Sequence, residues 1–391
     1  MDISIVMAYF VLMAFVLGMA ALPQFRFVDE AKSSARYSAL DGLRGFAALS
    51  VFFHHVAITY YFIVAGEWSH AGSRFYTLLG PVGVSLFFMI TGFLFWGKML
   101  RTKGRPAWQE LYIHRIFRIG PLYLFVVLVM LFIVFAKTGF QLLESPSAVM
   151  GSALQWLALG IIDTQPDVNA YQAKYVLAGV TWTIFYEWVF YASLIATAFF
   201  ARGRMHLVYI CVGLVLSLIT RRFLHWESSG FAMLFLCGMS VASLLHENIK
   251  LRLPPKLSSA IALACISAVL IWSENGYGIP TILLLAIFFY LVCSGTSVFG
   301  LLTATPATRL GNISYSIYLM QGLVLTTVFA ITPVKNFAMA SVLNYWTIGT
   351  LCLCVLLVCA ALGYAFIERP GIALGKQLSR RQTSAVNPEL S

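Results

Sequence analysis

The sequence predicts an all-α protein, a polytopic membrane bundle of about eleven transmembrane helices, and three observations support this prediction. Of the 391 residues, 60% are hydrophobic and only 10% are charged, with a mean hydropathy of +0.85. The apolar residues gather into runs close to the roughly 20 residues that cross about 30 Å of hydrocarbon as a helix. The charged residues fall mostly between those runs. A water-soluble surface could not cover a chain of this composition.

The candidate spans follow one another along nearly the whole chain. They cover residues 3–23, 42–65, 79–98, 119–137, 178–200, 207–221, 229–246, 257–273, 280–299, 312–331 and 344–367. A further apolar patch, AVMGSALQWLALGII at residues 148–162, is short for a span. Its length suits a re-entrant or interfacial segment.

The loop charges favour eleven spans over twelve and give an expected orientation. With loops 24–44 and 98–118 placed inside, eleven spans leave 20 of the 26 Lys and Arg residues on the inner side. A twelfth span at 148–162 would change that division to 14 against 12. The positive-inside rule therefore predicts an outside N-terminus and a cytoplasmic C-terminus.

The composition also argues against two kinds of partner. The net charge of +11 comes from residues in short loops, which form no basic stripe with interleaved aromatic residues, so we expect lipid headgroups and no nucleic acid as partner. Seven cysteines lie inside apolar runs without a CxxC pair or a Cys/His ligand spacing. We therefore expect neither disulfides nor a bound metal.

Residues 40–56, LDGLRGFAALSVFFHHV, place an arginine and two histidines in an apolar run. On a helix, Arg44 and His55 lie only roughly 20° apart around the axis and about 16 Å apart along it, whereas His54 is turned about 80° away from His55. A buried imidazole is costly unless it faces protein or water. The pair suits a reaction on a cytosolic anionic cofactor. The sequence is equally consistent with an Arg44 that only anchors the topology and a His55 that only forms a hydrogen bond to another helix.

Arg115 and Arg118 stand three residues apart, so on a helix they project from one face. This pair would suit the phosphates of a cytosolic coenzyme, because arginine makes bidentate contacts. A pure topology signal would look the same. We expect Gly80, Gly83 and Gly92 to mark close helix packing, not a phosphate loop.

Two acidic residues also need a role. Glu187 lies in TWTIFYEWVFY after the long outside segment 138–177, so we expect it in the outer half of the membrane. There it would orient the histidine, hold a sugar hydroxyl or cap a helix. Glu368 and Arg369 stand beside Pro370, and we expect them to form an interfacial ion pair at the end of the last helix.

Six motifs, in this order, resemble those of the acyltransferase-3 family of bacterial integral membrane O-acyltransferases. They are LDGLRGFAALSVFFHH at 40–55, GPVGVSLFFMITGFLF at 80–95, HRIFRIGPLY at 114–123, TWTIFYEWVFY at 181–191, LGNISYSIYLMQ at 310–321 and FIERP at 366–370. The family's arginine followed after ten residues by an essential histidine corresponds to Arg44 and His55. Two features depart from the family: the span at 3–23 precedes its ten-helix core, and Gln321 stands where it often has histidine, so we give Gln321 no proton-transfer role.

The resemblance implies an O-acyltransferase of the bacterial inner membrane that acts on a cell-envelope or exported carbohydrate. The donor would be acyl-CoA, with acetyl-CoA as the leading expectation, and the acceptor a hydroxyl of a carbohydrate or lipid-linked glycan. His55 would serve as general base or transient acyl carrier, assisted by Glu187, while Arg44, Arg115 and Arg118 would hold the donor. No metal is implied.

The expected organisation has three parts. Residues 1–37 form the extra N-terminal span and an inside loop, residues 38–375 the acyltransferase-3 membrane domain, and residues 376–391 a mobile cytoplasmic tail. The rival from another functional class is a transporter of a small anion or lipid-linked sugar that uses the same Arg and His residues for binding. A transporter would favour two similar halves, and we find no internal repeat. A structural or sensory membrane protein would tolerate the loss of His55.

Overall fold

The computed structural model describes residues 3, 5–29, 38–68, 72–224 and 228–386, with the side chains of 381–386 excepted. Part of the expected inside loop, residues 30–37, and the last five residues of the expected tail lie outside the described residues. Every regular element in the described part of the chain is helical, apart from an isolated bridge between Val168 and Tyr171. The all-α polytopic bundle is therefore confirmed.

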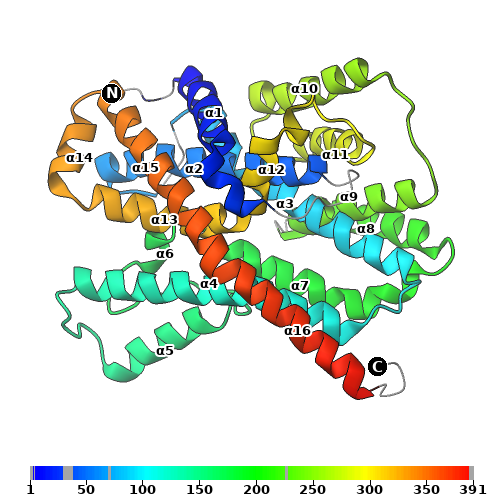
Figure 1. Ribbon diagram of the computed structural model, residues 1–391, viewed down its shortest axis with the longest axis horizontal. Coiled ribbons are helices and arrows are strands. Elements are labelled where there is room, and N and C mark those ends of the chain that lie inside the picture. The colour runs from blue at the N-terminus through cyan, green and yellow to red at the C-terminus, as the bar shows by residue number, and fades with distance from the viewer. Residues whose placement is uncertain (1–2, 4, 30–37, 69–71, 225–227, 387–391) are drawn as a thin grey trace.

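The helices of the first half of the chain include most of the predicted site. In order they are α1 (Val6–Ala21), a 3₁₀ helix η1 (Pro23–Val28), α2 (Ser38–Ala65), α3 (Arg74–Arg101), α4 (Trp108–Lys137), α5 (Pro146–Leu157), α6 (Ala173–Val176) and α7 (Trp182–Thr197). A 3₁₀ turn η2 (Ala198–Ala201) extends α7. Figure 1 shows these elements in blue to green.

The second half begins with helices that pack on α3 and ends with one long rod (Figure 1). Its elements are α8 (Met205–Phe223), α9 (Ser228–His246), α10 (Pro255–Trp272), α11 (Ile279–Cys293), η3 (Leu301–Thr303), α12 (Thr305–Asn312), α13 (Ser314–Phe329), α14 (Thr332–Met339), α15 (Val342–Gly363), a π-helical turn η4 (Tyr364–Glu368) and α16 (Arg369–Val386). The expected tail from residue 376 thus begins as helix, because α16 continues to Val386.

Each of the eleven predicted spans contains a helix. Among the described residues, eight helices are long and apolar enough to cross a membrane, counting α15 to α16 as one rod. The pair α13 and α14 would make a ninth span, bent by 92°, while α1 and α11 are shorter apolar helices. The patch at 148–162 corresponds mainly to the 12-residue helix α5, which is too short to cross a bilayer.

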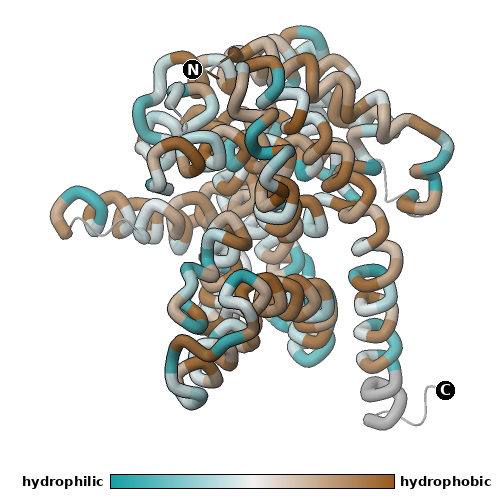
Figure 2. Tube along the Cα trace, turned by 90° about the vertical axis from the view of Figure 1, so that its left-hand side faces the viewer, coloured by the Kyte–Doolittle hydropathy of each residue, from teal (hydrophilic) through white to brown (hydrophobic). Residues whose placement is uncertain are grey.

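The outer helices keep large apolar side chains exposed, as a lipid-facing surface requires. On α8, Val208, Val215 and Leu216 are each more than half exposed. Figure 2 shows hydrophobic residues in brown on most helices of the bundle, with hydrophilic residues at many of the turns. Exposing these apolar side chains to water would be unfavourable, so they support a membrane location.

The centre of the bundle depends on glycines where helices cross. A Cβ atom on Gly92 of α3 would strike the carbonyl oxygen of Phe235 on α9, and one on Gly238 of α9 would strike that of Met89 on α3. A Cβ atom on Gly83 would lie 2.6 Å from the carbonyl oxygen of Ala47 on α2. The predicted packing role of these α3 glycines is confirmed.

An arginine of the core binds the C-terminal end of the extra N-terminal helix. Arg309 of α12 donates from Nη1 to the carbonyl oxygens of Ala20, Ala21 and Leu22 at 2.9, 3.3 and 3.1 Å, so it caps the C-terminal end of α1. The same guanidinium forms a fork with Asp29, at 2.7 and 3.0 Å. The α1 helix is thus docked onto the rest of the bundle.

Candidate active site

Four of the five predicted site residues line one cavity of about 170 Å³. Arg44 reaches it from α2, Arg115 and Arg118 from α4, and Glu187 from α7. The cavity lies at the N-terminal ends of α2 and α4 and the C-terminal end of α3, which we predict to face the cytosol. We call it the arginine cavity.

Arg44 is positioned by the close packing of two motifs far apart in the sequence. The neighbouring Gly45 lies against α12, where a Cβ atom would come within 2.8 Å of the backbone nitrogen of Gly311. A Cβ atom on Gly311 would in turn strike the backbone of Asp41. Because both contacts are with backbone atoms, larger residues would push α2 away from α12 and move Arg44 with it.

Arg115 lies among aromatic rings. Its guanidinium carbon is 4.8 Å from the ring centre of Phe95 and 6.0 Å from that of Tyr191. The Tyr191 hydroxyl donates to Oε2 of Glu187 at 2.9 Å. Arg115 and Glu187 therefore contact one tyrosine, which joins a cation and an anion at the cavity wall.

Arg118 forms an ion pair with Glu368, for which the sequence predicted a different partner. Its Nη2 lies 3.8 Å from Oε1 of the fully buried Glu368, whose Oε2 accepts a hydrogen bond from Ser316 at 2.9 Å. The expected pair between Glu368 and Arg369 was wrong. Arg369 points outward and donates to the carbonyl of Phe27, because the π-helical turn before it directs Glu368 into the bundle.

Glu187 does not lie apart from the arginines, in an outer half of the path, as the sequence suggested. It lines the same cavity as Arg44 and the α4 arginines. The reason is the segment between α6 and α7, where Leu177, Val180 and Thr181 are buried inside the bundle. Since the chain has already returned into the protein, α7 begins at depth and Glu187, in its second turn, reaches the arginine cavity.

His55 lines a second cavity, of about 640 Å³, which we call the histidine cavity. Its wall includes the middle of α2, the N-terminal end of α3, Trp68 after α2, Trp182 of α7 and the connection between α10 and α11. His55 itself is 8% exposed. Arg44 and His55 share a helix, as predicted, but they line different cavities.

The His55 imidazole is held by a buried amide. Its Nδ1 lies 3.2 Å from Oε1 of Gln321 on α13, and the Gln321 Nε2 donates to the carbonyl oxygen of Tyr318 at 2.8 Å. Because that bond directs the amide oxygen to the imidazole, the pattern assigns the proton to Nδ1. Nε2 of His55 is then the atom able to accept a proton.

Aromatic stacking restricts the same ring further. The centroid of Trp68 lies 6.1 Å from that of His55 with 30° between the planes, and Tyr175 stacks on Trp68 at 5.1 Å and 25°. His54, the neighbour that helix geometry disfavoured, has Nδ1 2.8 Å from the carbonyl oxygen of Tyr76 and also lines the histidine cavity. The sequence alone did not indicate that both imidazoles line it.

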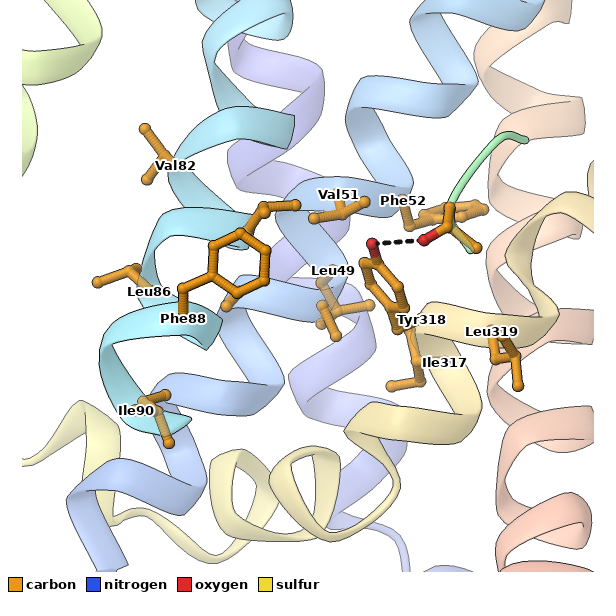
Figure 3. Close-up of a cluster of buried hydrophobic side chains, with 14 of the residues drawn as sticks. Leu49, Val51, Phe52, Val82, Leu86, Phe88, Ile90, Ile317, Tyr318 and Leu319 are labelled. Atoms are coloured by element: carbon orange, nitrogen blue, oxygen red, sulfur yellow. Dashed lines mark hydrogen bonds between the residues drawn. The ribbon is translucent and has the colours of Figure 1, made fainter. Parts of the chain in front are cut away.

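Two residues line both cavities, Val84 of α3 and Tyr318 of α13. The Tyr318 hydroxyl donates to the carbonyl oxygen of Val180 at 3.0 Å and lies 3.0 Å from the Thr183 hydroxyl. Figure 3 shows the Tyr318 ring among buried apolar side chains of α2, α3 and α13. Tyr318 therefore forms much of the partition between the arginine cavity and the histidine cavity.

Sequence reasoning missed Tyr318 and gave Gln321 no proton-transfer role. Both belong to the SYSIYLMQ stretch and are three residues apart, so on a helix they face the same way. That spacing was the available signal. Their partners, His55 and Val180, are more than a hundred residues away in the chain, and no periodicity reveals them.

A family model described as an acyltransferase domain matches residues 37–365, most of the chain. The chain belongs to the acyltransferase-3 family. It is accordingly a membrane acyltransferase, with the N-terminal helix α1 lying before the matched region. No curated protein and no solved structure matches the chain.

For this acyltransferase, the described side chains supply two kinds of chemistry. The arginine cavity gathers three cations and one carboxylate, which suits a phosphate-bearing donor. The histidine cavity presents an imidazole with a defined tautomer, which suits proton abstraction from a hydroxyl.

Proposed function

We propose that this acyltransferase transfers an acyl group, acetyl in the first instance, from cytosolic acyl-CoA to a hydroxyl of a cell-envelope or exported carbohydrate. The carrying observation is the pair of adjacent cavities, one cationic and the other containing His55. CoA has anionic phosphates, and an acyl-CoA has an uncharged thioester. Such a donor therefore suits the cationic arginine cavity. The inner (plasma) membrane of a bacterium is the location this assignment requires.

Arg44, Arg115 and Arg118 would hold the donor. Arginine binds phosphate oxygens with two parallel donors, and the aromatic wall beside Arg115 keeps its guanidinium oriented. The cavity wall also includes apolar side chains such as Phe87 and Leu94, suited to the pantetheine arm. The thioester brings an already activated carbonyl, so the protein needs to add position and a base.

His55 is the proposed base. Its Nε2 would take the proton of the attacking hydroxyl as the new ester bond forms, and the carbon–sulfur bond of the thioester would break. Returning that proton to the sulfur releases CoA as the free thiol. Transient attachment of the acyl group to Nε2 is the other route that this geometry permits. Glu187, bonded to Tyr191, would hold the Arg115 side of the site in place.

The test replaces His55 by Ala and measures two quantities. Turnover of labelled acetyl-CoA by purified protein, and acetate released from envelope glycans of cells, should each fall by about 10²- to 10⁴-fold, the contribution of a positioned base. His206→Gln is the matched control, since His206 is a fully buried imidazole outside both cavities. Normal acetylation with His55→Ala at normal abundance would reject the proposal and favour a structural role.

A further inference from the structure

We propose that Ser314, the first residue of α13, is a catalytic residue that donates a hydrogen bond to the carbonyl oxygen of the acyl thioester and stabilises the negative charge that develops on it. The inference rests on the proposed function and deepens it by one residue. Its evidence is a buried hydroxyl without a partner, the cavity that this hydroxyl lines and its position along α13.

The Ser314 side chain is fully buried, and no group among the described residues forms a hydrogen bond with its Oγ. Other hydroxyls on the wall of the arginine cavity are paired: Tyr191 donates to Glu187, and Tyr315 donates to the carbonyl oxygen of Ile119. A buried hydroxyl left unpaired costs about 1–3 kcal/mol. Native proteins pair most buried polar groups, so an unpaired one that lines a cavity indicates a hydrogen bond to a ligand.

Contacts with α2 fix the level of Ser314 in the bundle. Gly45, beside the first cavity arginine, packs against Gly311. Ten residues later in each segment, from 45 to 55 and from 311 to 321, His55 bonds to Gln321. The two segments therefore run side by side in the same direction. Since Ser314 lies between these contacts, it lies between the level of that arginine and the level of the proposed base.

The position of Ser314 on α13 also places it on the donor side of the Tyr318 partition. Both residues line the arginine cavity, whereas only Tyr318 also lines the histidine cavity. Ser314 comes four residues before Tyr318, about 6 Å along the helix axis. Gln321 lies seven residues after Ser314 and only roughly 20° from it around that axis. One side of α13 therefore carries the unpaired hydroxyl, the partition and the amide that orients the base.

The thioester has to lie at this level during transfer. Its acyl carbon must meet a hydroxyl whose proton His55 takes, so the thioester lies beside the Tyr318 partition. In the proposed function the cavity arginines bind the phosphates of CoA, and the carbonyl oxygen needs a separate donor. The hydroxyl of Ser314 can supply that hydrogen bond, because it has no other partner among the described residues.

The Ser314 hydroxyl would act when the thioester is attacked. The acceptor oxygen bonds to the acyl carbon, the carbonyl electron pair moves to the carbonyl oxygen, and His55 takes the acceptor proton. Ser314 donates a hydrogen bond to this oxyanion and keeps its own proton. The electron pair then returns, the carbon–sulfur bond breaks, and the thiolate receives the proton from His55. Because the hydrogen bond is strongest to the charged oxygen, it lowers the barrier more than it tightens donor binding.

The experiment compares Ser314→Ala with two other variants of the purified full-length protein. Ser85→Ala is the matched control, because Ser85 of α3 is also fully buried, has no hydrogen-bond partner among the described residues and lines neither cavity. Ser314→Ala should lower kcat with acetyl-CoA about 10²- to 10³-fold, as removal of one such donor does. The Kd of acetyl-CoA and the kcat of Ser85→Ala should each stay within about threefold of the parent values. Ser314→Thr keeps a hydroxyl and should recover most of the activity.

Two further measurements separate catalysis from packing. Removing an unpaired hydroxyl should leave the thermal midpoint of both Ala variants at or above that of the parent. A hydrogen bond weakens a carbonyl bond, so isotope-edited infrared spectra of bound acetyl-CoA, labelled at the carbonyl carbon, should show a higher stretching frequency in Ser314→Ala than in the parent or Ser85→Ala.

The outcomes distinguish this inference from the proposed function. Full kcat or an unchanged carbonyl frequency in Ser314→Ala would overturn the role of Ser314. Equal losses of activity in Ser314→Ala and Ser85→Ala would overturn it as well, in favour of packing. In both cases the proposed function would stand if the parent binds acetyl-CoA and His55→Ala is inactive. A parent protein that does not bind acetyl-CoA would overturn the proposed donor, and the role of Ser314 with it.

Discussion

Nδ1 of His55 on α2 lies 3.2 Å from Oε1 of Gln321 on α13, in a buried contact between residues 266 positions apart. This contact gives the imidazole one tautomer and one orientation, with Nε2 left for the substrate. Gln321 does not itself need to touch a substrate to matter. In the proposed reaction it would act through His55, as a positioning residue.

Removing the Gln321 amide should therefore lower the rate of acyl transfer and leave donor binding unchanged. Gln321→Leu should lower kcat about 10- to 100-fold, as loss of an outer partner does for metal-binding histidines, with KM for acetyl-CoA within twofold. Gln321→Glu keeps an acceptor for Nδ1–H and should retain most activity. Steady-state kinetics on purified protein check both variants. A fall in activity that is the same for Leu and Glu would indicate a packing role.

For keeping the two cavities separate, the ring of Tyr318 should matter more than its hydroxyl. Tyr318→Phe loses the bonds to Val180 and Thr183 and should reduce stability by about 1 kcal/mol, with acetyl transfer within a few-fold of the parent. Tyr318→Ala joins the two cavities, so water should reach the thioester and acetyl-CoA hydrolysis without acceptor should rise about tenfold. Release of free thiol from acetyl-CoA measures this. No rise in a folded Ala variant would show that other side chains separate the cavities.

The ion pair between Arg118 and Glu368 should fix the geometry of the arginine cavity, where we propose that the donor binds. Glu368→Gln removes the charge that fixes Arg118, so KM for acetyl-CoA should rise about tenfold, equivalent to about 1.4 kcal/mol, while kcat changes little. Ser316→Ala is the matched control, because it removes a hydrogen bond to the other carboxylate oxygen and keeps the charge. A rise in KM of the same size for Ser316→Ala would mean that general packing of Glu368, and not its charge, sets the affinity.

The contact between Arg309 and Asp29 should stabilise the protein in a pH-dependent way. Bonding to Arg309 lowers the pKa of Asp29 below its ordinary value of about 3.9. A carboxyl whose pKa is lowered by folding contributes stability above its unfolded pKa and loses it as the pH falls through the folded pKa. The difference in thermal midpoint between the parent and Asp29→Asn should stay constant from about pH 5 to 8 and shrink below about pH 4.

Arg309→Ala tests the same contact from the other side. It removes the cap of α1 as well as the fork to Asp29, so it should cost about 2 kcal/mol or more and lower the thermal midpoint more than Asp29→Asn does. Thermal unfolding in detergent, with binding of acetyl-CoA as a second readout, measures the effect. Equal midpoints for Arg309→Ala and the parent would show that the other contacts of α1, among them the hydrogen bond between Tyr9 and Ser50, are sufficient to hold it.

Local periodicity was sufficient for most of the fold and for part of the site. Hydropathy located a helix in each expected span, and the three-residue spacing of Arg115 and Arg118 placed both at one cavity. The resemblance added Glu187. What these signals share is that each is set by residues close together in the chain, or by a motif that this sequence retains.

Features that depend on distant segments were not predicted. The depth of Glu187 follows from the burial of Leu177 to Thr181, which hydropathy alone does not distinguish from an ordinary loop. The partner of Glu368 follows from a π-helical turn, a change of one residue in helix register that carries no compositional mark. The cavities of Arg44 and His55 border each other at Val84 and at Tyr318, which lies on another helix. Such relationships arise only when the helices pack.

The long rod of α15, η4 and α16 has a practical consequence for handling the protein. Val342 to Arg380 form 39 residues of continuous helix, about 58 Å long, which is nearly twice the hydrocarbon thickness of a bilayer. Figures 1 and 2 show its C-terminal end extending well away from the rest of the bundle. We therefore expect a fusion partner attached at this end to stand away from the helical bundle, where antibodies and affinity resins can reach it.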